Sequence, residues 1–92
     1  MQKMIYFFFM IILYTLPTCP FCATVRDELG KLGISFDERD INEEAHLAEL
    51  LSKGRKRQVP FLVDDSTNTS MYESSDIVNY LKETYGENSK PN

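Results

Sequence analysis

The stretch Leu13-Tyr14-Thr15-Leu16-Pro17-Thr18-Cys19-Pro20-Phe21-Cys22 contains the change from strand to helix on which the predicted fold depends. Residues 10–15, which overlap the start of this stretch, form a continuous apolar and β-branched run that is typical of a strand buried on both faces. Pro20 suits the first turn of a helix, where the N–H that proline lacks would have no partner. Residues 22, 25, 29 and 32 then recur at helical spacing. We therefore predict a buried strand followed by an amphipathic helix with two cysteines at its start.

Cys19 and Cys22 are the only cysteines of the chain, and three positions separate them. At a helix N-terminus, unpaired N–H groups and the helix dipole stabilise a thiolate, which is the reactive form of a thiol. The spacing also lets Cys22 come within the S–S bond length of about 2 Å from Cys19. The pattern predicts a redox-active dithiol with Cys19 as nucleophile and Cys22 as resolving thiol. Two alternatives are a pair of small buried side chains and half of a zinc site shared across a dimer.

The rest of the chain alternates between helical and strand patterns. Residues 34–39 predict a second strand, and Asn42 can cap a second helix that Gly54 ends. We expect the buried side of this helix to consist of Ala45, Leu47, Ala48, Leu50 and Leu51. Residues 60–63 and 70–72 predict a hairpin around the turn formers at 65–69. A last helix follows, with Ser74 as a candidate N-cap, and extends to Tyr85.

The resulting order is β-α-β-α-β-β-α, an α/β fold with a mixed four-stranded sheet flanked by three helices. Right-handed crossovers lead us to expect that the first three strands run parallel. They also place the first and third helices on one face of the sheet and the second helix on the other. Ligands bind beyond the carboxyl ends of the strands in such open sheets, and Cys19 directly follows such an end.

The length and charge of the chain limit its organisation and its partners. Ninety-two residues fit one domain, and a net charge of −4 argues against nucleic acid or membrane surfaces as partners. We expect an apolar extension at residues 1–9, the domain at 10–86 and a polar tail at 87–92. The apolar run 4–13 lacks a signal-peptide cleavage site and is shorter than the roughly 20 residues of a membrane span. We therefore expect a cytoplasmic protein that begins at Met1 or Met10, with a membrane-directed segment as the alternative.

With these elements in place, residues 10–86 resemble the glutaredoxins of the thioredoxin-like fold. The resemblance lies in residues 13–15, in Cys19-Pro20-Phe21-Cys22 and in Val59-Pro60. It implies that Pro60 follows a cis peptide bond beside Cys19 and that the backbone of Val59 pairs with the peptide of glutathione. Only about 5–6% of X–Pro bonds are cis in folded proteins, so this prediction is specific. A proline at the first position of a strand, with no cis bond, is the alternative.

Two stretches depart from the glutaredoxin pattern. Leu16 stands where these proteins usually carry lysine, and Tyr72-Glu73-Ser74-Ser75-Asp76-Ile77 replaces a Gly-Gly-x-Asp-Asp stretch. The second stretch resembles the Glu-Ser motif of glutathione transferase N-terminal domains. This resemblance implies that Glu73 meets the ammonium group of glutathione, while Ser74 and the helix N-terminus meet its α-carboxylate. A plain N-cap role is the alternative for Ser74.

Two further residues are candidates for glutathione binding. Arg57 belongs to the basic run 53–57, directly before Val59-Pro60, and is expected to contact the glycyl carboxylate of glutathione. A solvated helix end explains the same charges, because the helix dipole favours cations there. Phe21 is either a wall for the ligand or a packing residue.

The resemblance to glutaredoxins implies a glutathione-dependent thiol–disulfide oxidoreductase that acts on protein disulfides or glutathionylated proteins. Glutathione would be the reducing co-substrate, and we expect a monomer with no bound cofactor or metal. The alternative is a transferase-like, glutathione-binding domain used for binding or sensing without turnover. An iron–sulfur carrier is less favoured, because glutaredoxins that hold clusters usually lack proline after the first cysteine.

Overall fold

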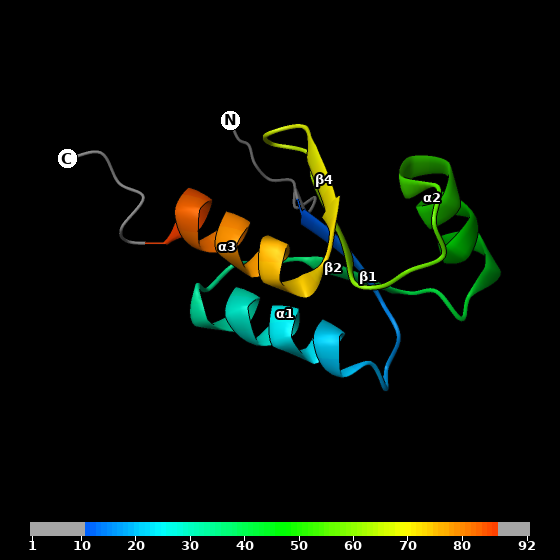
Figure 1. The fold of residues 1–92 in the computed structure, drawn as a ribbon, viewed down its shortest axis with the longest axis horizontal. Helices are drawn as coiled ribbons and strands as arrows, with labels where there is room; N and C mark the ends of the chain where they lie inside the picture. Colours follow the sequence, from blue (N-terminus) through cyan, green and yellow to red (C-terminus); the bar gives the residue numbers. More distant parts are fainter. Residues whose placement is uncertain (1–10, 87–92) are drawn as a thin grey trace, which may run out of the picture.

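The computed structural model describes residues 11–86, so the expected extension, Met10 and the expected tail lie outside the described residues. In this part of the chain four strands form one sheet of order β2-β1-β3-β4, with three helices around it (Figure 1). The strands are β1 (Ile11–Thr15), β2 (Asp37–Asp40), β3 (Phe61–Asp64) and β4 (Thr69–Tyr72). The helices are α1 (Pro20–Lys31), α2 (Glu44–Gly54) and α3 (Ser74–Tyr85). The expected order of elements and the mixed sheet are confirmed. None of these helices, all within residues 11–86, is both long enough and apolar enough to cross a membrane.

The directions of the strands correct one expectation. β1 pairs with β2 in parallel, but it pairs with β3 in the antiparallel sense, and β3 and β4 are also antiparallel. The prediction of three parallel strands was therefore wrong. The reason is the path after β2: α2 packs on the sheet, and residues 55–60 then bring the chain to the end of the sheet where β1 ends, so that β3 starts there (Figure 1). Phe61 consequently lies opposite Tyr14, near the end of β1.

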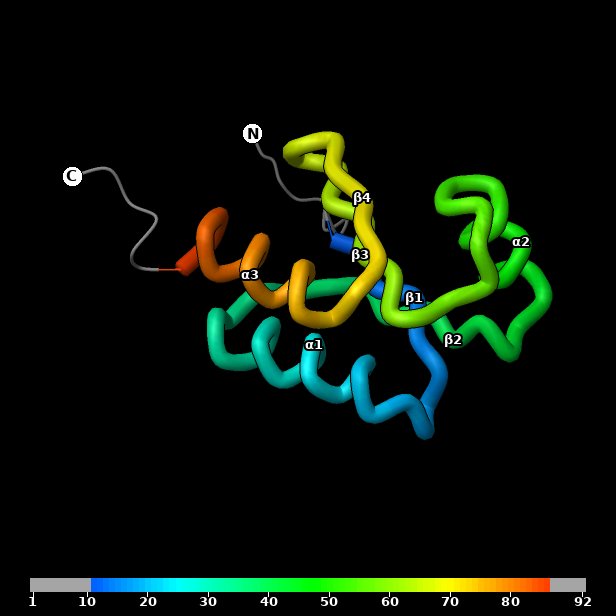
Figure 2. Tube along the Cα trace, viewed as in Figure 1, coloured from blue at the N-terminus to red at the C-terminus, as the bar shows by residue number. Residues whose placement is uncertain are grey.

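Two apolar cores cover the two faces of the sheet, as expected from the sequence. α1 and α3 lie side by side on one face and α2 lies on the other (Figures 1 and 2). The first core joins β1 and β3 to α1 and α3, and its buried members are Ile11, Leu13, Val25, Leu29, Leu62, Ile77 and Leu81. The second core joins the sheet to α2, and its buried members are Tyr14, Ile41, Leu50, Phe61 and Val63. The segments around Cys19, Pro60 and Glu73 therefore connect elements that are well packed.

The apolar side of α2 is narrower than the sequence predicts. Leu50 is fully buried and Leu47 is half-buried, whereas Ala45 and Ala48 are exposed and Leu51 is 41% exposed. The expectation that all five line the core was wrong, because α2 meets the sheet only along one edge of the helix.

The ends of α2 also differ from the expected ones. Glu43, not Asn42, occupies the N-cap position, and its side chain makes no capping hydrogen bond. Gly54 is still helical, and the left-handed turn that ends the helix falls on Arg55, with φ 70°. Its N–H donates to the carbonyl of Leu51 at 3.0 Å. The glycine is therefore not needed for the conformation of the turn.

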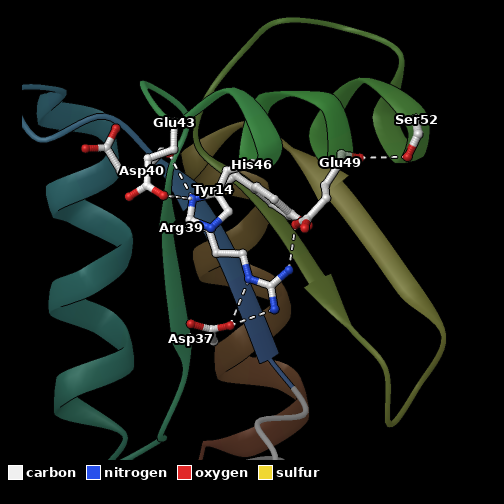
Figure 3. A network of polar contacts seen from close by, with 8 residues as sticks. All are labelled: Tyr14, Asp37, Arg39, Asp40, Glu43, His46, Glu49 and Ser52. Carbon is white, nitrogen blue, oxygen red and sulfur yellow. Dashed lines mark hydrogen bonds and ion pairs between the residues drawn. The ribbon is translucent and has the colours of Figure 1, made fainter.

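Polar contacts complete the attachment of α2 to the sheet (Figure 3). Arg39, on β2, lies between Asp37 and Glu49, with nitrogen–oxygen distances of 2.8 and 2.6 Å. The buried hydroxyl of Tyr14 donates to the same Glu49 oxygen at 3.0 Å. Burial, followed by the hydrogen bond to Glu49, raises the pKa of Tyr14 to about 12. Glu49 thus connects α2 to both β1 and β2 through polar contacts.

The second strand begins later than predicted, at Asp37 rather than at residue 34. The N–H of Ile34 donates to the carbonyl of Leu29 at 3.0 Å and so closes the end of α1. Ile34 and Phe36 pack against the first core. Their alternation, which predicted a strand, reflects two apolar anchors of a connecting segment.

The buried carboxylate of Asp64 connects helix α3 with the β3–β4 hairpin. Asp64, at the end of β3, is fully buried, and its Oδ2 accepts from the hydroxyls of Tyr80 and Tyr85 at 2.6 and 2.5 Å. Its Oδ1 accepts from the hydroxyl and N–H of Ser66, at 2.7 and 3.0 Å. Asp64 therefore ties α3 to the β3–β4 hairpin. A cavity of about 240 Å³ beside it is lined by Lys53 and residues of the hairpin and contains neither thiol.

Candidate functional site

The two thiols lie at the N-terminus of α1, as the sequence predicts. Cys19 is the N-cap residue, with an extended backbone at φ −83° and ψ 115°, and Pro20 begins the helix. The N–H of Cys22 donates to the Sγ of Cys19 at 3.3 Å. Cys19 is partly exposed, and Cys22 is fully buried. The arrangement presents one sulfur to solvent and keeps the second one helical turn further inside.

The environment of Cys22 separates the two thiols chemically. Burial, and next the hydrogen bond with Cys19, raises the pKa of Cys22 to about 12. A thiol with such a pKa remains protonated and unreactive at neutral pH. Burial therefore makes Cys22 the thiol that is held protonated, while its role in a reaction stays a prediction.

Arg26, which no motif in the sequence singled out, lies one turn beyond Cys22. Its Nη2 donates to the carbonyl of Leu16 at 3.4 Å, and its Nε donates to Glu38 at 2.6 Å. The charge of Arg26 lowers the pKa of Cys22, although burial has the larger, opposite effect. The only signal in the sequence was a cation four positions after Cys22. Arg26 joins the start of α1 to β2 and to the segment that leads to Cys19.

A cavity of about 490 Å³ opens beside the start of α1. Its lining comes from three segments that are far apart in the sequence: Phe21, Gln58, Val59, Pro60, Glu73, Ser74 and Ser75. Five of these are the residues that the sequence analysis selected for glutathione binding: Phe21, Val59, Pro60, Glu73 and Ser74. Gln58 and Ser75 were missed. A lone polar residue before a strand carries no recognisable pattern, and Ser75 was quoted only as part of the stretch around Glu73 and Ser74.

The Val59–Pro60 peptide bond is cis, which confirms that part of the prediction, and the position of Pro60 beside the Cys19 sulfur stays a prediction. Pro60 is buried, and Val59 is half-buried at the cavity wall. Within residues 11–86, no hydrogen bond uses the N–H or the carbonyl of Val59. This stretch of backbone can therefore pair with an extended peptide ligand.

Glu73 lies in a sparsely populated region of backbone conformation, with φ 71° and ψ 112°. A residue other than glycine holds such a conformation only where its surroundings enforce it, and such residues cluster at ligand sites. One carboxylate oxygen of Glu73 accepts from Nε2 of Gln58 at 3.2 Å, and both residues line the cavity. The exposed side chain thus offers a negative charge to the cavity from a fixed backbone.

Ser74 is the first residue of α3 and not its N-cap, so the plain capping alternative was wrong. Glu73 takes the N-cap position, and its side chain makes no capping hydrogen bond. The first N–H groups of a helix have no partner inside it. Those of Ser74 and Ser75 also have none elsewhere in residues 11–86. They provide hydrogen-bond donors for an anionic group in the cavity.

Arg57 is exposed and is not one of the residues that line the cavity, although it adjoins Gln58. Its contact with a ligand carboxylate remains a prediction. No group of three or more histidine, cysteine or acidic side chains that could hold a metal occurs in the described segment 11–86.

Comparisons with known proteins show which family the chain resembles and which solved structures share its fold. Residues 13–89 match the family of the glutathione S-transferase N-terminal domain. A solved glutathione transferase homolog from Drosophila mojavensis, with bound glutathione, is 30% identical, with a TM-score of 0.71. It covers 84% of this chain, and the match takes up 36% of that protein. The glutathione transferase URE2P6 of Phanerochaete chrysosporium, in complex with oxidized glutathione, is 25% identical, with a TM-score of 0.73, over 88% of this chain and 39% of its own.

The remaining comparison concerns the fold alone. A thioredoxin-like protein, BC3987, is 23% identical with a TM-score of 0.70, and the match covers 80% of this chain and 91% of that one.

No curated protein matches the chain. The chain spans little more than a third of the length of the two transferases. Because the family match covers most of its residues, the chain belongs to the family of glutathione S-transferase N-terminal domains.

Proposed function

We propose that this domain is a glutathione-dependent thiol–disulfide oxidoreductase of glutaredoxin type. The observation that carries the proposal is the pair of thiols: Cys19 is partly exposed at a helix N-terminus, and Cys22 is buried one turn away with its N–H on the Cys19 sulfur. A domain that only binds glutathione needs no second thiol at this place. Since both thiols must be kept reduced, we assign the activity to the cytoplasm.

The reaction begins when the Cys19 thiolate attacks the glutathionyl sulfur of a mixed disulfide. A Cys19–S bond forms, the original S–S bond breaks, and the released target thiolate takes a proton from water. A second glutathione thiolate then attacks the mixed disulfide on Cys19. Oxidised glutathione leaves, and the Cys19 thiolate is regenerated. In sum, the mixed disulfide and one glutathione thiol become the target thiol and oxidised glutathione, so the reaction is a thiol–disulfide exchange in which glutathione reduces the target sulfur.

Protein disulfides require Cys22. Attack by Cys19 leaves the target bound to the enzyme, and Cys22 then loses its proton and attacks the Cys19 sulfur. The target leaves as a dithiol, and a Cys19–Cys22 disulfide remains. Two glutathione molecules reduce this disulfide and leave as oxidised glutathione. Typical potentials of about −200 to −230 mV for glutaredoxins make glutathione a suitable donor.

We further propose that the cavity of about 490 Å³ holds glutathione. The open backbone of Val59 would pair with its peptide, Glu73 would meet its ammonium group, and Ser74 with the free N–H groups of α3 would meet its α-carboxylate. The two transferase structures with glutathione in them support this choice of ligand.

A second candidate function follows from the family match itself. The domain would bind glutathione, or contribute to its conjugation in a larger protein, without any cycle of disulfides. The Glu73-Ser74 stretch at the cavity favours this possibility. The fate of the thiols distinguishes the two candidates.

The deciding experiment is a single-turnover reaction between the reduced domain and a peptide joined to glutathione by a disulfide. Mass spectrometry should show glutathione transferred to Cys19 and the peptide released as a thiol. Cys19→Ser should abolish the transfer, whereas Cys22→Ser should preserve it and lose only the reduction of protein disulfides. A domain that binds glutathione but leaves the mixed disulfide intact would establish the second candidate. An absorption spectrum of protein prepared without oxygen tests for an iron–sulfur cluster.

A further inference from the structure

The loop between α2 and the cavity is fastened by one tyrosine hydroxyl. The hydroxyl of Tyr72, the last residue of β4, donates to the carbonyl of Lys56 at 2.8 Å. It also accepts from the N–H of Lys56 at 3.2 Å. Both main-chain polar groups of a single loop residue are therefore bound by one side-chain oxygen.

The ring that carries this hydroxyl is itself held in place. Its centroid lies 4.5 Å from that of Phe61, the residue opposite Tyr72 on β3. The ammonium nitrogen of Lys56 lies 5.1 Å from the same ring centroid. A Cβ atom on Gly54 would lie 2.2 Å from the Tyr72 hydroxyl oxygen. The role of Gly54 is therefore to let the end of α2 approach the tyrosine, which explains a glycine where the helix has not yet ended.

These contacts join the two walls of the cavity. Tyr72 immediately precedes Glu73, and Lys56 lies two residues before Gln58. Gln58 Nε2 in turn donates to Glu73 at 3.2 Å. Two successive residues between β4 and α3 thus each bind the loop: Tyr72 binds Lys56, and Glu73 binds Gln58. Tyr72 itself does not line the cavity.

We infer that Tyr72 is a positioning residue for ligand binding. Its hydroxyl fixes the position of the loop 55–58, and this loop places Val59, on one side of the cavity, at the distance from Glu73, on the other side, that the ligand requires. The identity of the ligand as glutathione rests on the proposed function. The role of Tyr72 does not depend on disulfide chemistry, and it acts through the positions of Gln58 and Val59 rather than by contact.

Tyr72→Phe tests the inference, because it removes only the hydroxyl and keeps the ring against Phe61. Titration calorimetry with reduced glutathione should give a dissociation constant about twofold to tenfold higher, which is the range of one or two net hydrogen bonds. The alkylation rate of Cys19 should remain that of the unchanged domain. Hydrogen exchange at the Lys56 amide should become faster, while exchange in α1 stays the same.

Two control variants isolate the hydroxyl. Lys56→Ala removes the ammonium group above the ring but leaves both main-chain bonds to Tyr72, so it should bind glutathione more tightly than Tyr72→Phe. Tyr80→Phe removes a tyrosine hydroxyl at the far end of β3, where it bonds to Asp64 at 2.6 Å, and should leave glutathione affinity unchanged. An equal loss of affinity in all three variants would overturn the inference, because it would indicate general destabilisation.

Three further outcomes decide whether Tyr72 positions the ligand. Unchanged affinity and unchanged Lys56 exchange in Tyr72→Phe would overturn the inference, whatever the activity of the domain. If the domain binds glutathione but does not reduce mixed disulfides, the proposed oxidoreductase fails, and the shift in the dissociation constant still decides the role of Tyr72. If the unchanged domain has no affinity for glutathione, both the glutathione site and the positioning role are overturned.

Discussion

Selective alkylation is the sharpest test of the roles assigned to the two thiols. Cys22 is fully buried, and its pKa is raised to about 12 by burial and then by the Cys19 hydrogen bond. At about pH 8, a thiol of pKa about 12 is thiolate in about one molecule in ten thousand, against about a quarter for a free cysteine of pKa about 8.5. Protonation alone should therefore slow the reaction of Cys22 by roughly two to three orders of magnitude relative to an unfolded chain.

The assay is brief treatment of the reduced domain with iodoacetamide, followed by mass spectrometry of its peptides. The folded domain should carry one adduct, on Cys19, and the unfolded chain should carry two. In Cys19→Ser the folded domain should be almost inert, since burial, the largest cause of the raised pKa, remains. If Cys22 in the folded domain reacted within about tenfold of its rate in the unfolded chain, the assignment of roles would be wrong.

The remaining predictions concern the cavity and the buried carboxylate. Glu73→Ala should weaken glutathione-dependent turnover about tenfold at low glutathione and much less at saturation, because the residue is assigned to binding. Arg57→Ala should have a smaller effect in the same assay, since water and salt screen an exposed cation. Asp64→Asn should lower the free energy of unfolding in urea by about 3 kcal/mol at neutral pH, whereas exposed Asp65→Asn should change it by less than about 0.5 kcal/mol. Burial alone would raise the pKa of Asp64, but hydrogen bonds from Tyr80, Tyr85 and Ser66 hold it below its ordinary value. This stabilisation is therefore complete above the unfolded-state pKa of about 4 and is lost as pH falls through the lower folded-state pKa, a slope that Asp64→Asn should reduce.

Much of the fold follows from local patterns in the sequence. Helical spacing from Cys22 to Leu32 and the proline at residue 20 were sufficient for α1, because that helix buries one continuous stripe. The same reasoning failed for α2, where Leu50 is buried and Leu51 is exposed. There the attachment depends on Glu49 and its partners on two strands, and such long-range polar contacts leave no period in the sequence.

The candidate site was predictable to the extent that its residues belong to short motifs. Cys19, Pro60 and Glu73 each stand in a motif with a recognisable chemical purpose. Gln58 and Tyr72 do not, since their roles depend on a loop that packs against the end of a distant strand. The conformation of Glu73, with φ 71°, was equally hidden, because nothing in the residue type indicates it.

The antiparallel direction of β3 makes the predicted site residues converge. Tyr14 and Tyr72 both lie opposite Phe61, so the end of β1, the start of β3 and the end of β4 lie at the same end of the sheet. Pro60 directly precedes Phe61, and Glu73 directly follows Tyr72, which brings the loop and the start of α3 to the edge from which the chain continues to Cys19. If the four residues of β3 ran parallel to β1, Pro60 would lie about 13 Å away, at the opposite edge. Five of the residues selected from the sequence meet in one cavity, although the parallel β3 that was also predicted would have separated them. A family motif therefore carried spatial information that strand periodicity and crossover rules did not.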